Sequence, residues 1–505
     1  MINKILLIDI EGIIRKNTDK FTENWSHHPI GLMYLASSVN AVYPEIEFKI
    51  FHTFTSAAPL QDLTELLHNF QPDLIGLRAL SLYKNDFYMV AQIIRNEFPG
   101  KYLIAGGPYP SISYEEILSN KLADLIVIGE GEITFREIIK ALQENNNLPT
   151  NISGTATVIN DRVIKNKPRP LISDVDSIPF PDYSLIDFKK YSKAVNQTFI
   201  GKDNTSMFSS RGCSFQCFYC HKLFGKVIRR RSPENIVAEM KYHYNERNIK
   251  NFIFLDDVFN VPLDAAKQVL KLISQSFCNI HINFPNGLRA DHIDDEFITL
   301  LEACGTIQIT LAIESANHRL QQYMEKNLDI DLAHLNIEKL SRKFIVTVMY
   351  IIGFPTETLS EAEETITFAE QLEYVTQPVL NILRVYVDSP ILNILNPSPE
   401  QMKLISNQSQ TSHFERVFYN GKFIKPTFYG DYFSRELVPL RSEDVFRLNI
   451  KWIHNVVNNS HRIAKSYNVM KQYISDNEIV SFYKNFFNNE EFEYSDLMRM
   501  MKHEA

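Results

Sequence analysis

The sequence has few cysteines, no long apolar run and no excess of basic residues. Five cysteines among 505 residues are sparse and odd in number, which argues against a disulfide framework. No apolar run approaches the roughly 20 residues that a membrane-spanning helix needs, and the opening MINKILLIDIEGII carries acids, unlike a signal peptide. A net charge of -8 gives no support for binding nucleic acid through phosphate contacts. We therefore expect a cytoplasmic protein without a membrane span and without a nucleic-acid partner.

Length and composition indicate an ordinary globular protein of about three domains, because 45% of the residues are hydrophobic and 22% are charged. The first part alternates apolar runs with helical patterns, which predicts a parallel sheet with helices on its faces. Glycines follow the later runs, where an open α/β sheet holds its ligands. The predicted strands are ILLIDI at 5–10, FKIFH at 48–52, LIGLRAL at 74–80, YLIAGG at 102–107 and LIVIGEGE at 125–132.

A connector and a second alternating region follow. The connector, 146–200, contains a hairpin pattern around Asn160 and Asp161 and then a proline-rich stretch. Six strand candidates over 201–390 alternate with helical stretches, which predicts a partial (β/α)6 barrel of the TIM type with its chemistry at the carboxyl ends of the strands. They are SMFSS, NFIFLDD, IHINFP, IQITLAI, FIVTVMYIIGF and VLNILRVYV.

The most informative motif is SSRGCSFQCFYCH, which places Cys213, Cys217 and Cys220 at a C-x3-C-x2-C spacing. A 4Fe-4S cluster normally takes four cysteine ligands, so three thiolates leave one iron open for a substrate or cosubstrate. A zinc site is the alternative, but structural zinc takes four ligands and His221 directly follows Cys220. The two other cysteines are Cys278 and Cys304, for which we expect a packing role.

This motif, with an aromatic Tyr219 before its third cysteine, resembles the signature of the radical S-adenosylmethionine (SAM) enzymes. The stretch YIIGFPTET and the phrase SIPFPDY fit the same likeness, although the sixth strand ends in VYVDSPI instead of the usual proline-glycine-threonine. Segment 1–145, with HPIGLMYLASSV, IAGGPYPS and VIGEGEITFREI, resembles the Rossmann-like cobalamin-binding domain that precedes the barrel in one subgroup. The implied fold is a doubly wound cobalamin-binding domain, a partial barrel and a mostly helical region over 391–505.

The resemblance implies three cofactors, namely a 4Fe-4S cluster, SAM and cobalamin, and a set of residues that would hold them. Glu314 would bond the ribose of SAM with help from Ser315, although Glu314 is also explained as a satisfied strand-end carboxylate. Arg289 would pair with the SAM carboxylate, or else with neighbouring Asp291. The other implied residues are Ile352, Gly353 and Phe354 at the adenine, Gly106, Gly107, Gly129 and Glu130 at the nucleotide tail of cobalamin, and Leu77 with the loop after it under the corrin.

Two absences in the first segment limit the chemistry. The D-x-H-x-x-G motif of cobalamin mutases is missing, so we expect no axial histidine from that position, and we assign His27 and His28 to the surface or to packing. Segment 1–145 has no cysteine for a second cluster, which disfavours methylthiolation. A flavodoxin-like module that binds another nucleotide, or none, is the alternative for this segment, since a fold does not fix a function.

The function implied by the resemblance is methylation of an unreactive carbon or phosphorus centre. One SAM would methylate cobalamin, and a second would give a 5′-deoxyadenosyl radical that activates the substrate. Expected partners are a small-molecule or peptide substrate and a reductant such as a flavodoxin or ferredoxin. Segment 391–505 would cap the barrel mouth, or else form a packing lobe without substrate contact. The alternatives are a cyclase or rearrangement enzyme without methyl transfer, and a cobalamin-binding sensor or carrier with a structural cluster.

Overall fold

The computed structural model describes residues 2–13, 26–191, 199, 203–220, 224–386, 389–410, 418–419, 422–423, 425–487, 489 and 491–502. The chain divides into two compact units. The first takes in Met1–Asn196 and Lys222–Arg231, and the second takes in Gln197–His221 and Ser232–Ala505. The chain therefore returns to the first unit for about ten residues after the cysteine motif. No helix in the described part of the chain is long and apolar enough to cross a membrane.

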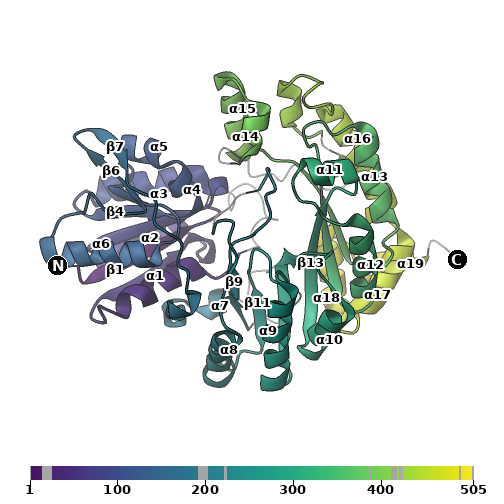
Figure 1. The fold of residues 1–505 in the computed structure, drawn as a ribbon, viewed down its shortest axis with the longest axis horizontal. Helices are drawn as coiled ribbons and strands as arrows, with labels where there is room; N and C mark the ends of the chain where they lie inside the picture. Colours follow the sequence, from purple (N-terminus) through teal and green to yellow (C-terminus); the bar gives the residue numbers. More distant parts are fainter. Residues whose placement is uncertain are drawn as a thin grey trace. The chain divides into compact units, whose positions relative to one another are not determined.

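The first unit is built on a seven-stranded sheet in the order β2-β1-β3-β4-β5-β6-β7. Figure 1 labels β1, β4, β6 and β7 of this sheet. Pairing is parallel from β2 to β5, and the five predicted strands are all present. Buried side chains of α1 and α6 form one core against the sheet, and those of α2, α3 and α5 form another. The parallel strands are β1 (Lys4–Ile10), β2 (Glu47–His52), β3 (Leu74–Ala79), β4 (Tyr102–Gly106) and β5 (Leu125–Val127), and the helices are α1 (Ile30–Asn40), α2 (Pro59–Phe70), α3 (Lys84–Glu97), α4 (Pro108–Ile112), α5 (Tyr114–Ser119) and α6 (Glu132–Asn145).

The predicted hairpin is confirmed, and it extends this sheet. Strands β6 (Thr155–Ile159) and β7 (Arg162–Lys165) pair antiparallel, and β6 pairs antiparallel with β5. Asn160 and Asp161 both have positive φ, as a type I′ turn requires. The first unit is consequently larger than the predicted domain of 1–145, because backbone hydrogen bonds of β6 add the start of the predicted connector to the sheet.

The second unit contains the six predicted strands in sequential order, β15-β14-β13-β12-β11-β8, all parallel. This is the sheet of a partial barrel, with a helical layer packed on its outer face. The strands are β8 (Asn204–Met207), β11 (Asn251–Phe254), β12 (His281–Leu288), β13 (Thr306–Glu314), β14 (Ile345–Ile352) and β15 (Gln377–Ile382), and the helices are α8 (Pro233–Arg247), α9 (Leu263–Ser276), α10 (Asp295–Ala303), α11 (His318–Tyr323), α12 (Ile330–Ser341) and α13 (Leu359–Glu370).

The face of β13 opposite the helices is polar. Alternate residues Ile309, Leu311 and Ile313 pack into the helix-covered core, whereas Gln308 and Thr310 are buried on the other face. Successive side chains of a strand point to opposite faces, so this alternation defines the barrel interior. Glu314 continues the polar set at the end of β13.

The C-terminal region has helices at both ends of the second unit. The sequence pattern predicts helical stretches at 399–407, 442–458 and 478–488, and these correspond to α15, to α16 with a π-helical turn at Ile453–Val457, and to α18. Helices α17, α18 and α19 pack on Ile307 and Ile345, which lie at the amino ends of β13 and β14. Figure 1 shows α18 near the lower end of this unit and α11 and α14 near its upper end. The region's helices are α14 (Ile391–Leu395), α15 (Pro399–Gln410), α16 (Ser442–Trp452), α17 (Ser460–Met470), α18 (Asp476–Phe486) and α19 (Tyr494–Lys502).

The predicted capping region, 391–505, contacts both ends of the barrel sheet. Phe428 and Tyr429 contact Gly353 at the carboxyl end of β14, on the side where a barrel does its chemistry. The helices from Ser460 onward instead close the opposite end, where Arg462 is fully buried and donates hydrogen bonds to Val375 O and Thr376 O. We therefore limit the capping prediction to the part before α16.

Candidate active site

The three motif cysteines lie on the loop that follows β8, at the carboxyl end of the barrel sheet. The buried carboxylate of Asp256 accepts hydrogen bonds from Ser209 N at 3.1 Å, Ser209 Oγ at 2.7 Å and Ser210 Oγ at 2.5 Å. Asp257 accepts one from Gly212 N at 3.2 Å, where the backbone has a positive φ of 93°. Asp256 and Asp257 follow β11, so the neighbouring strand fixes the start of the cysteine loop.

The thiols occupy an environment that suits bound iron better than free thiolates. Burial and then the neighbouring Cys217 and Cys213 raise the pKa of Cys220 to about 12, and burial raises that of Cys213. A cluster supplies the positive charge that such thiolates lack. Among the described residues, no three His, Cys, Asp or Glu side chains are placed to surround a single metal ion.

Glu314 lies next to this loop and is held by two side chains. Its Oε1 accepts hydrogen bonds from Tyr219 OH at 3.1 Å and from Lys326 Nζ at 2.9 Å. Burial and then the Glu314 charge raise the pKa of Tyr219 well above its usual value, so the phenol keeps its proton and donates. A register shift in β13 precedes Glu314, whose φ of 65° is unusual for this residue type. Strained backbone of this kind is often found at functional sites.

Arg289 lies beside the cysteine loop, but its polar groups and those of Ser315 are already bound by protein partners. The Arg289 guanidinium contacts Asp291 through Nε at 2.7 Å, donates to the carbonyls of Lys326 and Asn327 at 2.8 Å, and lies 3.8 Å from the Phe215 ring centroid. These contacts match the structural alternative, because four of the five N–H donors have protein partners.

The Ser315 hydroxyl is likewise used within the fold. It lies 3.3 Å from Thr365 Oγ1 on α13 and accepts a hydrogen bond from Asn317 N. The sequence did not indicate a role for Lys326. Its contact with Glu314 reveals one, because no motif links the end of β13 to the loop after α11 in which Lys326 lies.

The YIIGFPTET turn is shaped by contacts from three sides. Gly353 has a φ of 96°, donates its N–H to Glu357 Oε2 at 2.5 Å and accepts from Tyr429 OH at 2.7 Å. Phe428 packs so closely that a Cβ on Gly353 would lie 2.6 Å from its ring. Phe354 is fully buried, with its ring centroid 5.3 Å from that of Tyr219.

Ile352 was expected beside the adenine, but its side chain points the other way. It is fully buried with Tyr350 in the core beneath the helices. Ile351 and Met349, on the alternate face of β14, are partly exposed. A strand alternates its faces at every residue, so the side chain available to a ligand in the barrel is that of Ile351.

Glu357 is the buried acid behind this turn, and we expect it to make stability depend on pH. Burial raises its pKa to about 8, despite hydrogen bonds from Phe354 N and Gly353 N. Between its ordinary pKa of 4.5 and about 8, only the unfolded chain releases this proton, so stability falls as pH rises through that window. At pH 7 the cost is roughly 3 kcal/mol, at about 1.4 kcal/mol per pKa unit.

Glu357→Gln should abolish this cost, because the amide keeps an acceptor oxygen and cannot ionise. The melting temperature of the cluster-free variant should match the wild type near pH 5 and exceed it increasingly towards pH 8. Glu361→Gln, in the first turn of α13, is the control: Arg319 lowers the pKa of Glu361 to about 2, so this variant should lose the same amount of stability throughout pH 5–8. Parallel melting curves for Glu357→Gln and wild type across this range would contradict the prediction.

In the first unit, the predicted cobalamin residues cluster at the carboxyl ends of β4 and β5. Gly107, with a φ of 85°, approaches Arg78 so closely that a Cβ would lie 2.8 Å from its Cγ. Gly129 has a φ of 82°, and nothing lies within 4 Å of where its Cβ would be. Gly106 ends β4, beside the Val127 carbonyl. The Gly129 turn therefore leaves open space for a ligand, as the cobalamin prediction requires.

Leu77 and Glu130 have different surroundings from those expected. Leu77 lies in the middle of β3, is 2% exposed and packs in a hydrophobic core, so only the loop after Ala79 remains available to a corrin. Glu130 is buried in an ion pair with Arg229, at 2.7 and 2.9 Å. A solvated turn is the natural expectation for three consecutive arginines, but Arg229 and Arg231 are both buried.

Polar groups also gather where β1 and β3 end, at the switch point of the strand order. Arg78 pairs with Asp9 at 2.7 Å, and Glu11 contacts His52 at 3.0 Å. Ligands of open α/β sheets bind at such a switch point. His28 packs against Phe188 and Tyr191. Burial lowers the pKa of His27, and its Nδ1 is buried without a hydrogen-bond partner among the described residues.

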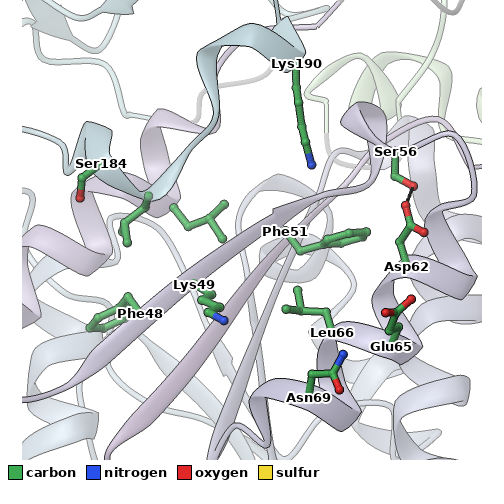
Figure 2. Close-up of a pocket in the computed structure, with 12 residues that line it drawn as sticks. Phe48, Lys49, Phe51, Ser56, Asp62, Glu65, Leu66, Asn69, Ser184 and Lys190 are labelled. Carbon is green, nitrogen blue, oxygen red and sulfur yellow. Dashed lines mark hydrogen bonds between the residues drawn. The ribbon is translucent and has the colours of Figure 1, made fainter. Parts of the chain in front are cut away.

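A cavity of about 630 Å³ lies elsewhere in the first unit, between the edge strand β2 and α2. Phe48, Phe51 and Leu66 contribute its apolar wall, and Lys190 points towards it (Figure 2). Ser56 donates a 2.5 Å hydrogen bond to Asp62 at its edge. None of the predicted cofactor residues lines this cavity, so we do not include it in the candidate active site.

Comparison with known proteins identifies both domains. Residues 207–369 match the Radical SAM superfamily, and residues 24–139 match the B12 binding domain. An uncharacterized methyltransferase of Pyrococcus horikoshii is 32% identical over 350 residues, which are 68% of this chain and 73% of that protein. The chain belongs to the cobalamin-dependent radical SAM enzymes.

Two further relatives extend the likeness. Cytidylyl-2-hydroxyethylphosphonate methyltransferase of Streptomyces wedmorensis is 24% identical over 68% of this chain and 73% of its own length. The solved structure of the radical SAM methyltransferase TsrM from Kitasatospora setae, with cobalamin and a [4Fe-4S] cluster bound, shares the fold of this radical SAM enzyme. Its TM-score is 0.64 at 16% identity, over 95% of this chain and 90% of that chain.

Proposed function

We propose that this chain is a cobalamin-dependent radical SAM methyltransferase that acts on an unactivated carbon or phosphorus centre. The observation that carries the proposal is the cysteine loop beside the Tyr219–Glu314–Lys326 group, in one chain with a cobalamin-type domain. The relatives at 32% and 24% identity are both named as methyltransferases, which supports methyl transfer. When bound, the cluster with SAM supplies a hydrogen-abstracting radical and cobalamin supplies the methyl group.

The barrel residues have distinct tasks in this proposal. Cys213, Cys217 and Cys220 hold the cluster, and Glu314 binds ribose hydroxyls, since its Oε1 is already oriented by Tyr219 and Lys326. Lys326 replaces Arg289 as the cation for the SAM carboxylate, because its side chain is 9% exposed and its ammonium has further donors. The backbone of Gly353 and the side chain of Ile351 bound the adenine pocket.

In the cobalamin-binding domain, Gly106, Gly107 and Gly129 line the site of the nucleotide tail, and the loop after Ala79 supports the corrin. The enzyme needs an electron donor and a substrate, and we propose a flavodoxin or ferredoxin and a small molecule or peptide in the cytoplasm. The protein contributes binding, orientation and exclusion of water, because the cofactors carry the difficult chemistry.

A labelling experiment tests the proposal before the substrate is known. The enzyme, with its cluster and cobalamin, is reduced anaerobically with SAM that carries a deuterated methyl group. We expect label in the cobalamin fraction, together with 5′-deoxyadenosine and methionine from reductive cleavage, by mass spectrometry.

Two other outcomes would point to the alternatives. Deoxyadenosine without label on cobalamin would favour a cyclase or rearrangement enzyme, and neither product would favour a sensor or carrier. Glu314→Gln is the matched variant, since it should weaken SAM binding at the cluster at least tenfold while leaving cobalamin binding unchanged.

A further inference from the structure

An ion pair in the first unit connects the predicted cobalamin turn to a distant part of the chain. Glu130 directly follows Gly129 after β5, and Arg229 Nη1 donates to both of its carboxylate oxygens, at 2.9 and 2.7 Å. The side chains are only 3% and 7% exposed. Charges this well buried persist only when they are paired and hydrogen-bonded, so the contact is a fixed part of this unit.

The pair also binds a third segment. Ile172 N donates to Glu130 Oε2 at 2.9 Å, and Arg229 donates to Ile172 O at 2.8 Å and to Phe224 O at 3.0 Å. Next to it, Leu171 lies against Gly225, and the Arg231 guanidinium lies over the Phe180 ring at 5.4 Å. Residues 171–180 and 224–231 are thus held together around a single carboxylate.

Arg229 lies in a segment that directly follows the cysteine loop in the sequence. Lys222–Arg231 belongs to the first unit but begins two residues after Cys220. The same stretch of chain is therefore continuous with the cluster loop at one end and bonded to the cobalamin turn at the other. Glu130 is unavailable as a direct cobalamin ligand, because both of its oxygens have protein donors.

We propose that Arg229 is a positioning residue for cobalamin: by holding Glu130 it fixes the Gly129 turn, so that cobalamin binding depends on the segment that leaves the cluster loop. This rests on the proposed cobalamin site at Gly129. By linkage, cobalamin must in turn stabilise the seated form of residues 224–231 by the same factor. The chain thereby couples assembly of its two cofactor sites through covalent continuity.

Cobalamin binding by full-length variants tests the proposal. Dissociation constants are measured by equilibrium dialysis for wild type, Arg229→Met, Arg229→Lys and Glu130→Gln. We expect at least a tenfold weaker affinity for Arg229→Met and a smaller loss for Arg229→Lys, which keeps the charge but not the bidentate geometry. Arg95→Met is the matched control, because Arg95 pairs with Asp124 at 2.7 Å, just before β5 and so at the opposite end of that strand from Gly129.

Hydrogen exchange distinguishes a positioning role from a purely stabilising one. An ion pair that only stabilised the fold would not make the exchange of these amides depend on cobalamin. In the wild type, adding cobalamin should slow exchange of backbone amides in 224–231, and in Arg229→Lys this protection should fall by the same factor as the cobalamin affinity. Equal affinity in wild type and the Arg229 variants, or an equal loss in Arg95→Met, would overturn the proposal. Absence of cobalamin binding by the wild type would instead refute the proposed function.

Discussion

A variant with alanine at Cys213, Cys217 and Cys220 should contain no iron–sulfur cluster and should cleave no SAM reductively. The three thiols are the proposed ligands of the cluster, and an alanine side chain has no atom that can bind iron. We expect complete loss of the visible absorbance of the cluster after reconstitution, and deoxyadenosine at the level of the protein-free control. Iron and sulfide analysis with anaerobic product assays measures both.

The same variant separates the two cofactor sites. It should still bind cobalamin, because no cysteine lies in the first unit's sheet, and it should still transfer labelled methyl from SAM to cobalamin if that SAM does not need the cluster. Cys278→Ala is the control, since Cys278 is exposed, contrary to the packing role expected for it, and lies outside the cysteine loop. Retention of a full cluster by the triple variant would show that other ligands hold it.

The positions of the strands along the chain were predictable because burial leaves a regular pattern in parallel sheets. Strand β1 is covered on both faces, so it appears as a nearly continuous apolar run. The predicted strands of both sheets were found on this basis. The cysteine loop was equally legible, because its ligands are close in sequence and their spacing alone carries the chemistry.

Side-chain partners were less predictable because they come from distant segments. Arg289 donates hydrogen bonds to carbonyls almost forty residues later in the chain. Glu130 pairs with Arg229, which follows a segment that belongs to the second unit. The choice between Ile351 and Ile352 depended on one residue of register, which reverses every side chain of a strand. A polar residue at a strand end is thus a candidate for binding a ligand, but the sequence does not show whether other protein groups already bind its side chain.

The C-terminal helices illustrate a further limit. Apolar periodicity predicted α15, α16 and α18, but it does not say which end of the sheet a helix covers. The aromatic side chains of α18 pack among α17 and α19, and Tyr473 donates to Lys343 O before β14. The last helices therefore stabilise the base of the barrel, whereas Phe428 and Tyr429 contact Gly353 at its carboxyl end.

Gly353→Ala should weaken SAM binding by at least tenfold. A non-glycine residue at positive φ costs about 1–2 kcal/mol, and the new Cβ would lie 2.6 Å from the Phe428 ring. Relief requires the turn or the ring to move, and either shift disturbs the peptide that Glu357 and Tyr429 hold. A loss of about 1.4 kcal/mol already corresponds to tenfold in affinity. Titration calorimetry of SAM with the anaerobic, cluster-loaded protein measures the change.

The contribution of the ring can be separated from that of the backbone by adding Phe428→Leu. The smaller side chain removes the ring atoms nearest to Gly353, so the double variant should recover part of the lost affinity, and the remainder reports the strain of positive φ. Phe428→Leu alone should bind SAM nearly as well as wild type, because Tyr429 and Glu357 still hold the Gly353 peptide. Wild-type affinity in Gly353→Ala would show that this turn does not contact SAM, and an unchanged deficit in the double variant would assign the whole effect to the backbone.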